Sequence, residues 1–210
     1  MSTQAARPRP KRKTFWLKQL HTWHWISSAV SLVGLLLFAV TGFTLNHAAD
    51  IEAGPKVVSK SEQLPPPLLR EIAPGGPDVK KPLPPPVARW VEGNFPTHAG
   101  GIAEWTGSDV YLPLPRPGGD GWVSIDRSSG AVTSEFTDRG WISYLNDLHK
   151  GRNSGAAWKW FIDVFAFACL VFSLTGLVLL WLHAAKRRIT WPLVFLGLAI
   201  PAAIAIFFIH

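Results

Sequence analysis

Three long apolar runs dominate this chain and limit it to a fold that crosses a membrane. Trp23 to Leu45 provides 23 residues in which His24 is the only ionisable side chain, and about 20 suffice to cross the hydrocarbon core as a helix. Phe161 to Leu182 forms a second run, with Asp163 near its start, and Trp191 to Ile209 forms a third. Tryptophans, which favour membrane interfaces, lie at the ends of these runs: Trp16, Trp23, Trp25, Trp158, Trp160, Trp181 and Trp191. The sequence therefore predicts three transmembrane helices.

Basic residues beside these runs predict how the chain is oriented. The segment before the first run contains no acidic residue, and its basic residues are Arg7, Arg9, Lys11, Arg12, Lys13 and Lys18. The loop before the third run contains Lys186, Arg187 and Arg188. Because such residues stay on the cytoplasmic side, we expect a cytoplasmic N-terminus and an external C-terminus. Residues 48–155 hold 13 Asp and Glu against 11 Lys and Arg, so the net charge of +7 arises in the flanks. We therefore expect the lipid bilayer, and no nucleic acid, as a partner.

The fold class that follows is a membrane α-helical protein of three transmembrane helices, with a small extracytoplasmic α+β insertion between helices 1 and 2. The predicted segments are a basic cytoplasmic tail (1–15), transmembrane helix 1 (16–47), a proline-rich strap with a short helix (48–96), an antiparallel β meander (97–140), an outer-mouth segment (141–155), transmembrane helix 2 (156–185), a basic cytoplasmic loop (186–190) and transmembrane helix 3 (191–210).

The insertion has two parts with different local patterns. Eleven of the 18 prolines lie in residues 55–96, which favours an extended strap, and Pro85 to Phe95 is typical of a short helix. Four later stretches alternate with period two, and they are Gly101–Thr106, Val110–Leu114, Gly121–Ile125 and Ala131–Phe136. Asp126 to Gly130 supplies the turn between the last two. We expect three or four antiparallel strands.

The first two apolar runs repeat one signature of histidine, Phe-x-x-Thr-Gly and histidine. Its landmarks are Leu20-His21, Phe38, Thr41-Gly42 and His47 in the first copy, and Leu148-His149, Phe172, Thr175-Gly176 and His183 in the second. Five of the seven histidines (His21, His24, His47, His149 and His183) thus lie at the ends of two membrane helices, where an ionisable residue indicates function by default. The Thr-Gly pairs let two backbones approach and offer a hydroxyl for an interhelical hydrogen bond.

Because the two helices run in opposite directions, matched ends meet and the histidines form two groups. His21 or His24 would pair with His183 at the inner end, and His47 would pair with His149 at the outer end. A neutral imidazole binds metal without bringing charge into the membrane, so each pair suits the two axial positions of haem b. His24 and His47 are separated by about 35 Å of helix, at about 1.5 Å per residue, which is too far for fast exchange between two haems.

Two other interpretations of the histidines stay open. Each could simply be a polar, hydrogen-bonding residue at headgroup depth, without a cofactor. Alternatively, His47 and His149 could bind a metal ion without porphyrin, with neighbouring polar residues orienting the rings.

Several segments resemble the PepSY-associated transmembrane family, in particular its short, PepSY-TM-like branch. They are Leu20-His-Thr-Trp-His-Trp-Ile-Ser-Ser-Ala, Phe38-Ala-Val-Thr-Gly-Phe-Thr-Leu-Asn-His47, Leu145-Asn-Asp-Leu-His-Lys-Gly-Arg-Asn-Ser154, Thr175-Gly176 and Leu182-His183. The hairpin from Val123 to Val132 is similar to that of PepSY domains, and it faintly resembles the pattern to which flavin transferases attach FMN through a threonine. Thr133 falls one place late for that pattern, so we expect an ordinary turn and no covalent FMN.

The resemblance implies a protein of the inner membrane of a Gram-negative bacterium. The external C-terminus that the basic residues predict would then lie in the periplasm. It also implies haem-containing relatives that reduce periplasmic ferric siderophores. The first hypothesis is therefore a b-type haem electron-transfer protein, which passes electrons from the cytoplasmic side or quinol to a periplasmic redox partner or ferric chelate. The second is a non-catalytic assembly or regulatory subunit that binds a periplasmic partner, and the third is metal handling at the periplasmic face. No catalytic residue is assigned, and both enzymatic activity and a homo-oligomer stay open.

Overall fold

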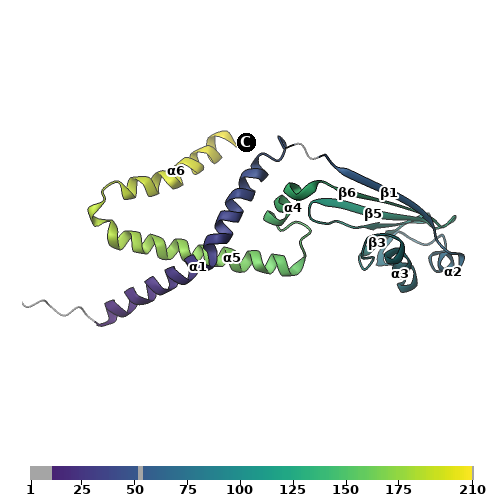
Figure 1. Ribbon diagram of the computed structural model, residues 1–210, viewed down its shortest axis with the longest axis horizontal. Coiled ribbons are helices and arrows are strands. Elements are labelled where there is room, and N and C mark those ends of the chain that lie inside the picture. The colour runs from purple at the N-terminus through teal and green to yellow at the C-terminus, as the bar shows by residue number, and fades with distance from the viewer. Residues whose placement is uncertain (1–10, 52–53, 210) are drawn as a thin grey trace, which may run out of the picture. The chain divides into compact units, whose positions relative to one another are not determined.

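Three long apolar helices and an α+β insertion make up the described chain, which confirms the predicted fold class (Figure 1). The computed structural model describes residues 11–51 and 54–209. Within these residues, the helices long and apolar enough to span a membrane are α1 (Lys11–Asn46), α5 (Gly155–His183) and α6 (Thr190–Phe208). Part of the predicted tail 1–15 lies outside the described residues. Its last residues already belong to α1, because nothing from Lys11 onward breaks a helix.

The chain divides into two compact units, each of which is described by itself. The first consists of the described parts of Met1–Leu36 and Asp163–His210, and the second of the described parts of Leu37–Ile162, with the insertion.

Side chains on the long helices are arranged as expected for a lipid environment. Large apolar residues face outward, as at Val33, which is 74% exposed, whereas the small polar Ser31 is fully buried. The hydroxyl of Ser31 donates to the carbonyl of Ser27 at 2.7 Å, and that of Ser27 donates to the carbonyl of Trp23 at 2.7 Å. Both buried hydroxyl groups therefore have a hydrogen-bond acceptor. Small residues inside and large apolar residues outside are typical of helices that pack together in a bilayer.

Glycine permits a close approach of α1 and α5 within the first unit. A Cβ atom on Gly34 would lie 2.9 Å from Cδ2 of Phe165, which is closer than real Cβ atoms come to a ring carbon. Phe165 is buried, so the ring has little room to move. The contact of these two helices therefore requires a residue without a side chain at position 34.

The described part of the insertion forms a single antiparallel sheet with strand order β1-β6-β5-β4-β3-β2. Figure 1 shows β1, β6 and β5 of this sheet next to one another. Its strands are β1 (Lys56–Gln63), β2 (Val79–Pro82), β3 (Ile102–Trp105), β4 (Asp109–Pro113), β5 (Gly119–Asp126) and β6 (Ala131–Asp138). Strands β3 to β6 confirm the four predicted stretches. The expected strand number was too low, because the proline-rich segment contributes both edge strands.

The two strands that were not predicted are the edge strands of the sheet, and edge strands have weaker sequence patterns. An edge strand needs partners on one side only, so it tolerates proline, as Pro82 in β2 shows. Strand β1 is exposed along nearly its whole length and so lacks the alternation by which buried strands are recognised. Other prolines begin helices, at Pro66 in α2 (Pro66–Leu69) and at Pro85 in α3 (Pro85–Asn94), where the missing N–H costs nothing.

Helix α3 packs on one face of the sheet and closes the hydrophobic core. Val87 and Val91 on the helix are fully buried together with inward-facing strand residues such as Val110, Val123 and Val132. The turn after β5 is held by Asp126, whose Oδ1 accepts hydrogen bonds from the backbone and side chains of the two serines that follow it. These bonds, the Ser128 hydroxyl first, keep the pKa of Asp126 well below its usual range, so the carboxylate stays charged and holds the predicted turn.

A buried arginine joins the sheet to the preceding loops. Arg127 is only 7% exposed, and its Nε donates to the carbonyl of Ile72 at 2.8 Å. Its two other nitrogens donate to the carbonyls of Ala73 and Thr106. The guanidinium carbon lies 5.4 Å from the centroid of the Trp105 ring, within the range of a cation–π contact. One side chain thus satisfies three backbone carbonyls that precede β2 or follow β3.

The predicted outer-mouth segment contains a helix that the sequence did not reveal, α4 (Gly140–His149). Its polar residues Asn146 and Asp147 are buried. Asp147 accepts a hydrogen bond from the backbone of Gly118 at 2.9 Å, and Asn146 accepts one from the hydroxyl of Thr44 at 2.8 Å. These two residues therefore position α4 against neighbouring segments of the second unit.

Candidate functional site

His24 lies on the Phe-x-x-Thr-Gly motif of α5, within the first unit. Its Nδ1 is 2.9 Å from the hydroxyl oxygen of Thr175, and its ring stacks on that of Phe172 with centroids 4.9 Å apart and planes at 17°. A Cβ atom on Gly176 would come within 3.3 Å of Cε1 of His24. One imidazole ring therefore contacts the phenylalanine, the threonine and the glycine of a single motif.

His149, at the end of α4, has the same arrangement in the second unit. Its Nδ1 is 2.7 Å from the hydroxyl oxygen of Thr41, and its ring lies 4.9 Å from the ring of Phe38, centroid to centroid. A Cβ atom on Gly42 would lie 3.4 Å from Cε1 of His149. The Phe-x-x-Thr-Gly motif of each copy thus contacts a histidine of the other copy. By these contacts, His24 has the position in the first copy that His149 has in the second.

The threonine hydroxyls determine which nitrogen of each imidazole carries the proton. Thr175 donates its single hydroxyl hydrogen to the carbonyl of Val171 at 2.7 Å, and Thr41 donates its own to the carbonyl of Leu37 at 2.9 Å. With its hydrogen placed there, each hydroxyl oxygen accepts, and we assign the Nδ1–H of His24 and of His149 as the donor. In the neutral ring, Nε2 therefore keeps its lone pair.

His21 and His183 form a second close pair in the first unit, one from α1 and one from the end of α5. Their ring centroids are 6.3 Å apart, with planes at 84°. Each Nδ1 lies 2.8 Å from a carbonyl oxygen of its own helix, that of Leu17 for His21 and that of Leu179 for His183. A carbonyl only accepts, so here too Nδ1 is the donor and Nε2 keeps its lone pair.

The structure does not bring the predicted outer pair together in this way. His47 has its Nδ1 3.1 Å from the carbonyl of Phe43, and its ring packs against the Phe43 ring at 4.6 Å, whereas His149 bonds to Thr41. Throughout residues 11–51 and 54–209, no three His, Cys, Asp or Glu side chains are grouped so as to hold a metal ion. A metal site at His47 and His149 stays a prediction. Thr133, considered for FMN, lies in β6 opposite Ser61 and Ser124.

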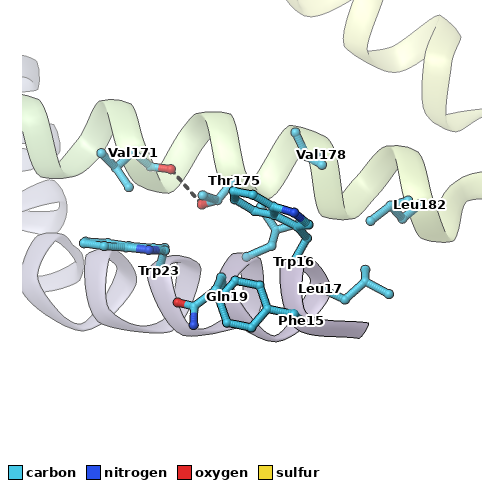
Figure 2. Close-up of a pocket in the computed structure, with 10 residues that line it drawn as sticks. Phe15, Trp16, Leu17, Gln19, Trp23, Val171, Thr175, Val178 and Leu182 are labelled. Carbon is cyan, nitrogen blue, oxygen red and sulfur yellow. Dashed lines mark hydrogen bonds between the residues drawn. The ribbon is translucent and has the colours of Figure 1, made fainter. Parts of the chain in front are cut away.

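A large apolar cavity of about 700 Å³ lies between the first part of α1 and the last part of α5 (Figure 2). It is lined by Phe15, Trp16, Leu17, Gln19, Leu20, Trp23, Val171, Thr175, Val178 and Leu182. Figure 2 shows the Trp16 and Trp23 rings and the Gln19 amide on the α1 side, with Thr175 and Val178 on the α5 side. Leu20 and Leu182 are the sequence neighbours of His21 and His183. We call this part of the helix pair the basic end, because Lys18 lies in this part of α1 and because Arg187 and Arg188 follow the end of α5.

The comparison with known proteins identifies the family. A family model described as "Putative PepSY_TM-like" matches residues 15–210. The chain belongs to this family. The match includes all five predicted site histidines and confirms the resemblance to PepSY-associated transmembrane proteins. No curated protein and no solved structure matches the chain.

For this PepSY_TM-like chain, the sequence correctly indicated that a Thr-Gly hydroxyl makes an interhelical hydrogen bond, as Thr175 does with His24. It did not indicate that the bond goes to a histidine. The sequence feature that could have indicated a histidine partner is the spacing of the motif. Phe172 lies three residues before Thr175, and Gly176 directly follows Thr175, so all three residues share one face of the helix.

Removing the Thr175 hydroxyl tests the assignment of the imidazole proton. In Thr175→Val, His24 loses the acceptor for its Nδ1–H, and since a typical hydrogen bond contributes about 1 kcal/mol net, its preference for that tautomer should fall about fivefold. Nitrogen-15 NMR of histidine-labelled protein in detergent measures the tautomer populations. Thr22→Val is the matched control, because Thr22 bonds to the carbonyl of Lys18 in its own helix. An unchanged His24 signal in Thr175→Val would contradict the assignment.

Proposed function

We propose that this chain is a b-type haem protein of the bacterial inner membrane, which passes electrons from the cytoplasmic side, or from quinol, to a periplasmic acceptor of the ferric siderophore or flavoprotein class. The observation that carries the proposal is the pair His21 and His183, whose rings approach to 6.3 Å from two different membrane helices. Haem, when bound, supplies one-electron chemistry at its iron.

His21 and His183 at the basic end would hold the iron of a haem. His21 and His183 each donate Nδ1–H to a backbone carbonyl, which fixes the ring orientation and increases the basicity of Nε2. Two neutral imidazoles bring no net charge into the membrane. The set thus contains two ligands and a hydrogen-bonded support for each.

The surroundings suit a porphyrin as well. The cavity beside the pair is almost entirely apolar and contains the aromatic rings of Phe15, Trp16 and Trp23 (Figure 2). Such walls favour a flat apolar macrocycle and exclude water from it. Lys18, Arg187 and Arg188 would supply cations for the two propionate groups, with which charged hydrogen bonds are strong. The same three cations favour a cytoplasmic basic end.

Absorption spectra of the purified protein test the proposal. After expression with an adequate haem supply, the full chain in detergent should show a Soret band and sharp bands on reduction. His21→Ala and His183→Ala each remove one proposed ligand, so bound haem should fall at least about tenfold or lose its six-coordinate spectrum. His98→Ala is the control, because His98 is fully exposed in the insertion. Wild-type protein without a Soret band, or alanine variants with an unchanged spectrum, would overturn the proposal.

A second candidate function is a non-catalytic assembly or regulatory subunit that binds a periplasmic partner. Its support is the seating of His24 and His149, each hydrogen-bonded to threonine and packed on phenylalanine, which is what structural histidines require. In that case the protein would bind no haem, yet His24→Ala and His149→Ala would lower its thermal stability. The spectra and the melting curves together separate the two functions.

A further inference from the structure

The face of the sheet that packs against α3 continues beyond the helix at the β1 edge. Antiparallel pairing places Val58 of β1 opposite Phe136 of β6, and Lys60 opposite Ser134. Directly paired residues share a face, so Val58 and Lys60 lie on the same side of the sheet as the buried Phe136 and Ser134. Val58 is nevertheless 64% exposed. This end of the core face therefore lacks a covering element among the residues that the structure describes.

A groove of about 320 Å³ occupies this uncovered end (Figure 1 shows β1 beside β6). It is lined by Lys56, Val58, Lys60, Phe95, Pro96, Arg116, Ser134, Phe136 and Asp138, and we call it the cationic groove. Val58 and Phe136 give it an apolar floor, and the buried Phe95 at the end of α3 contributes a second aromatic ring. A Cβ atom on Gly121 would lie 2.7 Å from Cδ1 of Phe136, so glycine in β5 makes room for the ring.

Positive charge predominates around the apolar floor. Lys56, Lys60 and Arg116 line the groove, against Asp138 as its acidic member. Arg116 donates to the neutral carbonyl of Thr137 at 3.2 Å, and Lys60 donates to the carbonyl of Asn94 at 2.8 Å. These carbonyls orient the cations without cancelling their charge.

Lys60 also pairs with Glu62 at 3.0 Å, and Asp138 accepts the backbone N–H of Gly140. Glu62 and Asp138 offset two of the three positive charges, so the groove keeps one net positive charge beside the apolar floor. Charge and shape together favour a ligand that is both flat and negative.

We infer that the cationic groove binds a small planar aromatic molecule that carries a phosphate or carboxylate group. The exposed Val58, with the small parts of Phe95 and Phe136 that reach the groove, would contact the aromatic system, and the cations would hold the anionic group by charged hydrogen bonds. The volume lies at the lower end of the range for small-molecule sites, which is roughly 300–1,000 Å³, so a ligand of two or three fused rings fits. The inference does not rest on haem, because every residue of the groove belongs to the insertion.

Flavin mononucleotide is a suitable probe, because its fluorescence anisotropy reports binding to the full chain in neutral detergent. Riboflavin has the same ring system without the phosphate, so it should bind about tenfold more weakly at low salt, and the difference should shrink as salt is added. Displacement of the probe by 1-naphthyl phosphate or by 1-naphthoate identifies the preferred anionic group. Equal binding of flavin mononucleotide and riboflavin, or displacement by neither competitor, would overturn the inference.

Substitutions then locate the site. The three cations are exposed and each contributes little, so the combined variant Lys56→Gln, Lys60→Gln and Arg116→Gln should weaken binding of flavin mononucleotide about tenfold. Val58→Glu puts a carboxylate into the groove at an exposed position and should weaken binding without harming the fold. Lys80→Gln in β2, at the opposite edge of the sheet, is the matched control. Unchanged affinity for flavin mononucleotide in both groove variants would refute the site. A wild-type protein that binds flavin mononucleotide but no haem would refute only the haem proposal.

Discussion

Replacing Arg127 with methionine is expected to lower the free energy of unfolding of the insertion by about 3–5 kcal/mol. Methionine preserves the length of the side chain and much of its packing on Trp105. It removes every donor, so the carbonyls of Ile72, Ala73 and Thr106 lose their hydrogen bonds. A buried acceptor left without a partner costs about 1–3 kcal/mol, and three are affected at once.

Hydrogen exchange of the full chain in detergent, followed by mass spectrometry, measures this effect locally. Amides of β3, β4 and β5 should exchange about 100-fold faster or more, because opening of the insertion becomes more frequent. Arg89→Met is the matched control, since Arg89 is exposed on α3 and bonds to the carbonyl of Pro85, so its change should stay within about 0.5 kcal/mol. If the two variants exchange alike, the proposed role of Arg127 is wrong.

Replacing Gly34 with valine should disrupt the contact between α1 and α5. The new side chain would overlap the ring of Phe165, and overpacking of this kind costs about 1–3 kcal/mol. We expect a lower melting temperature by circular dichroism in detergent, and weaker haem binding if the helices also move apart at the basic end.

A second substitution shows whether the clash is the cause. Phe165→Ala in the Gly34→Val background removes the ring and should recover part of the lost stability, which makes the two changes non-additive. Gly197→Val in α6 is the control, because a Cβ atom there meets nothing within 4 Å. Equal losses at positions 34 and 197, or no rescue by Phe165→Ala, would show that close packing at Gly34 is not required.

The parts of the fold that followed from sequence are those with a strong local signal. Length and apolarity alone predicted α1, α5 and α6, and alternation predicted β3 to β6. Strand β1 was not predicted, because an exposed edge strand lacks the alternation of apolar and polar residues. Helix α4 was not predicted, because its buried residues include the polar Asn146 and Asp147. Tertiary context, rather than local preference, decides both elements.

The candidate site shows the same limit. Sequence marked the five histidines and the Thr-Gly pairs, but it could not decide between His21 and His24. These residues are three apart and share one side of α1, so the rotation of the helix decides which ring meets Thr175 and which meets His183. That rotation results from packing along the helix pair, including the Gly34 contact.

The hydrogen bonds of the histidines have one more consequence. At His21, His24, His149 and His183, Nδ1 is already occupied by a carbonyl or a threonine oxygen, so each ring has one nitrogen left for chemistry. A proton and a metal ion must therefore compete for the same Nε2 atom. A metal ion bound at these rings would keep them from relaying protons.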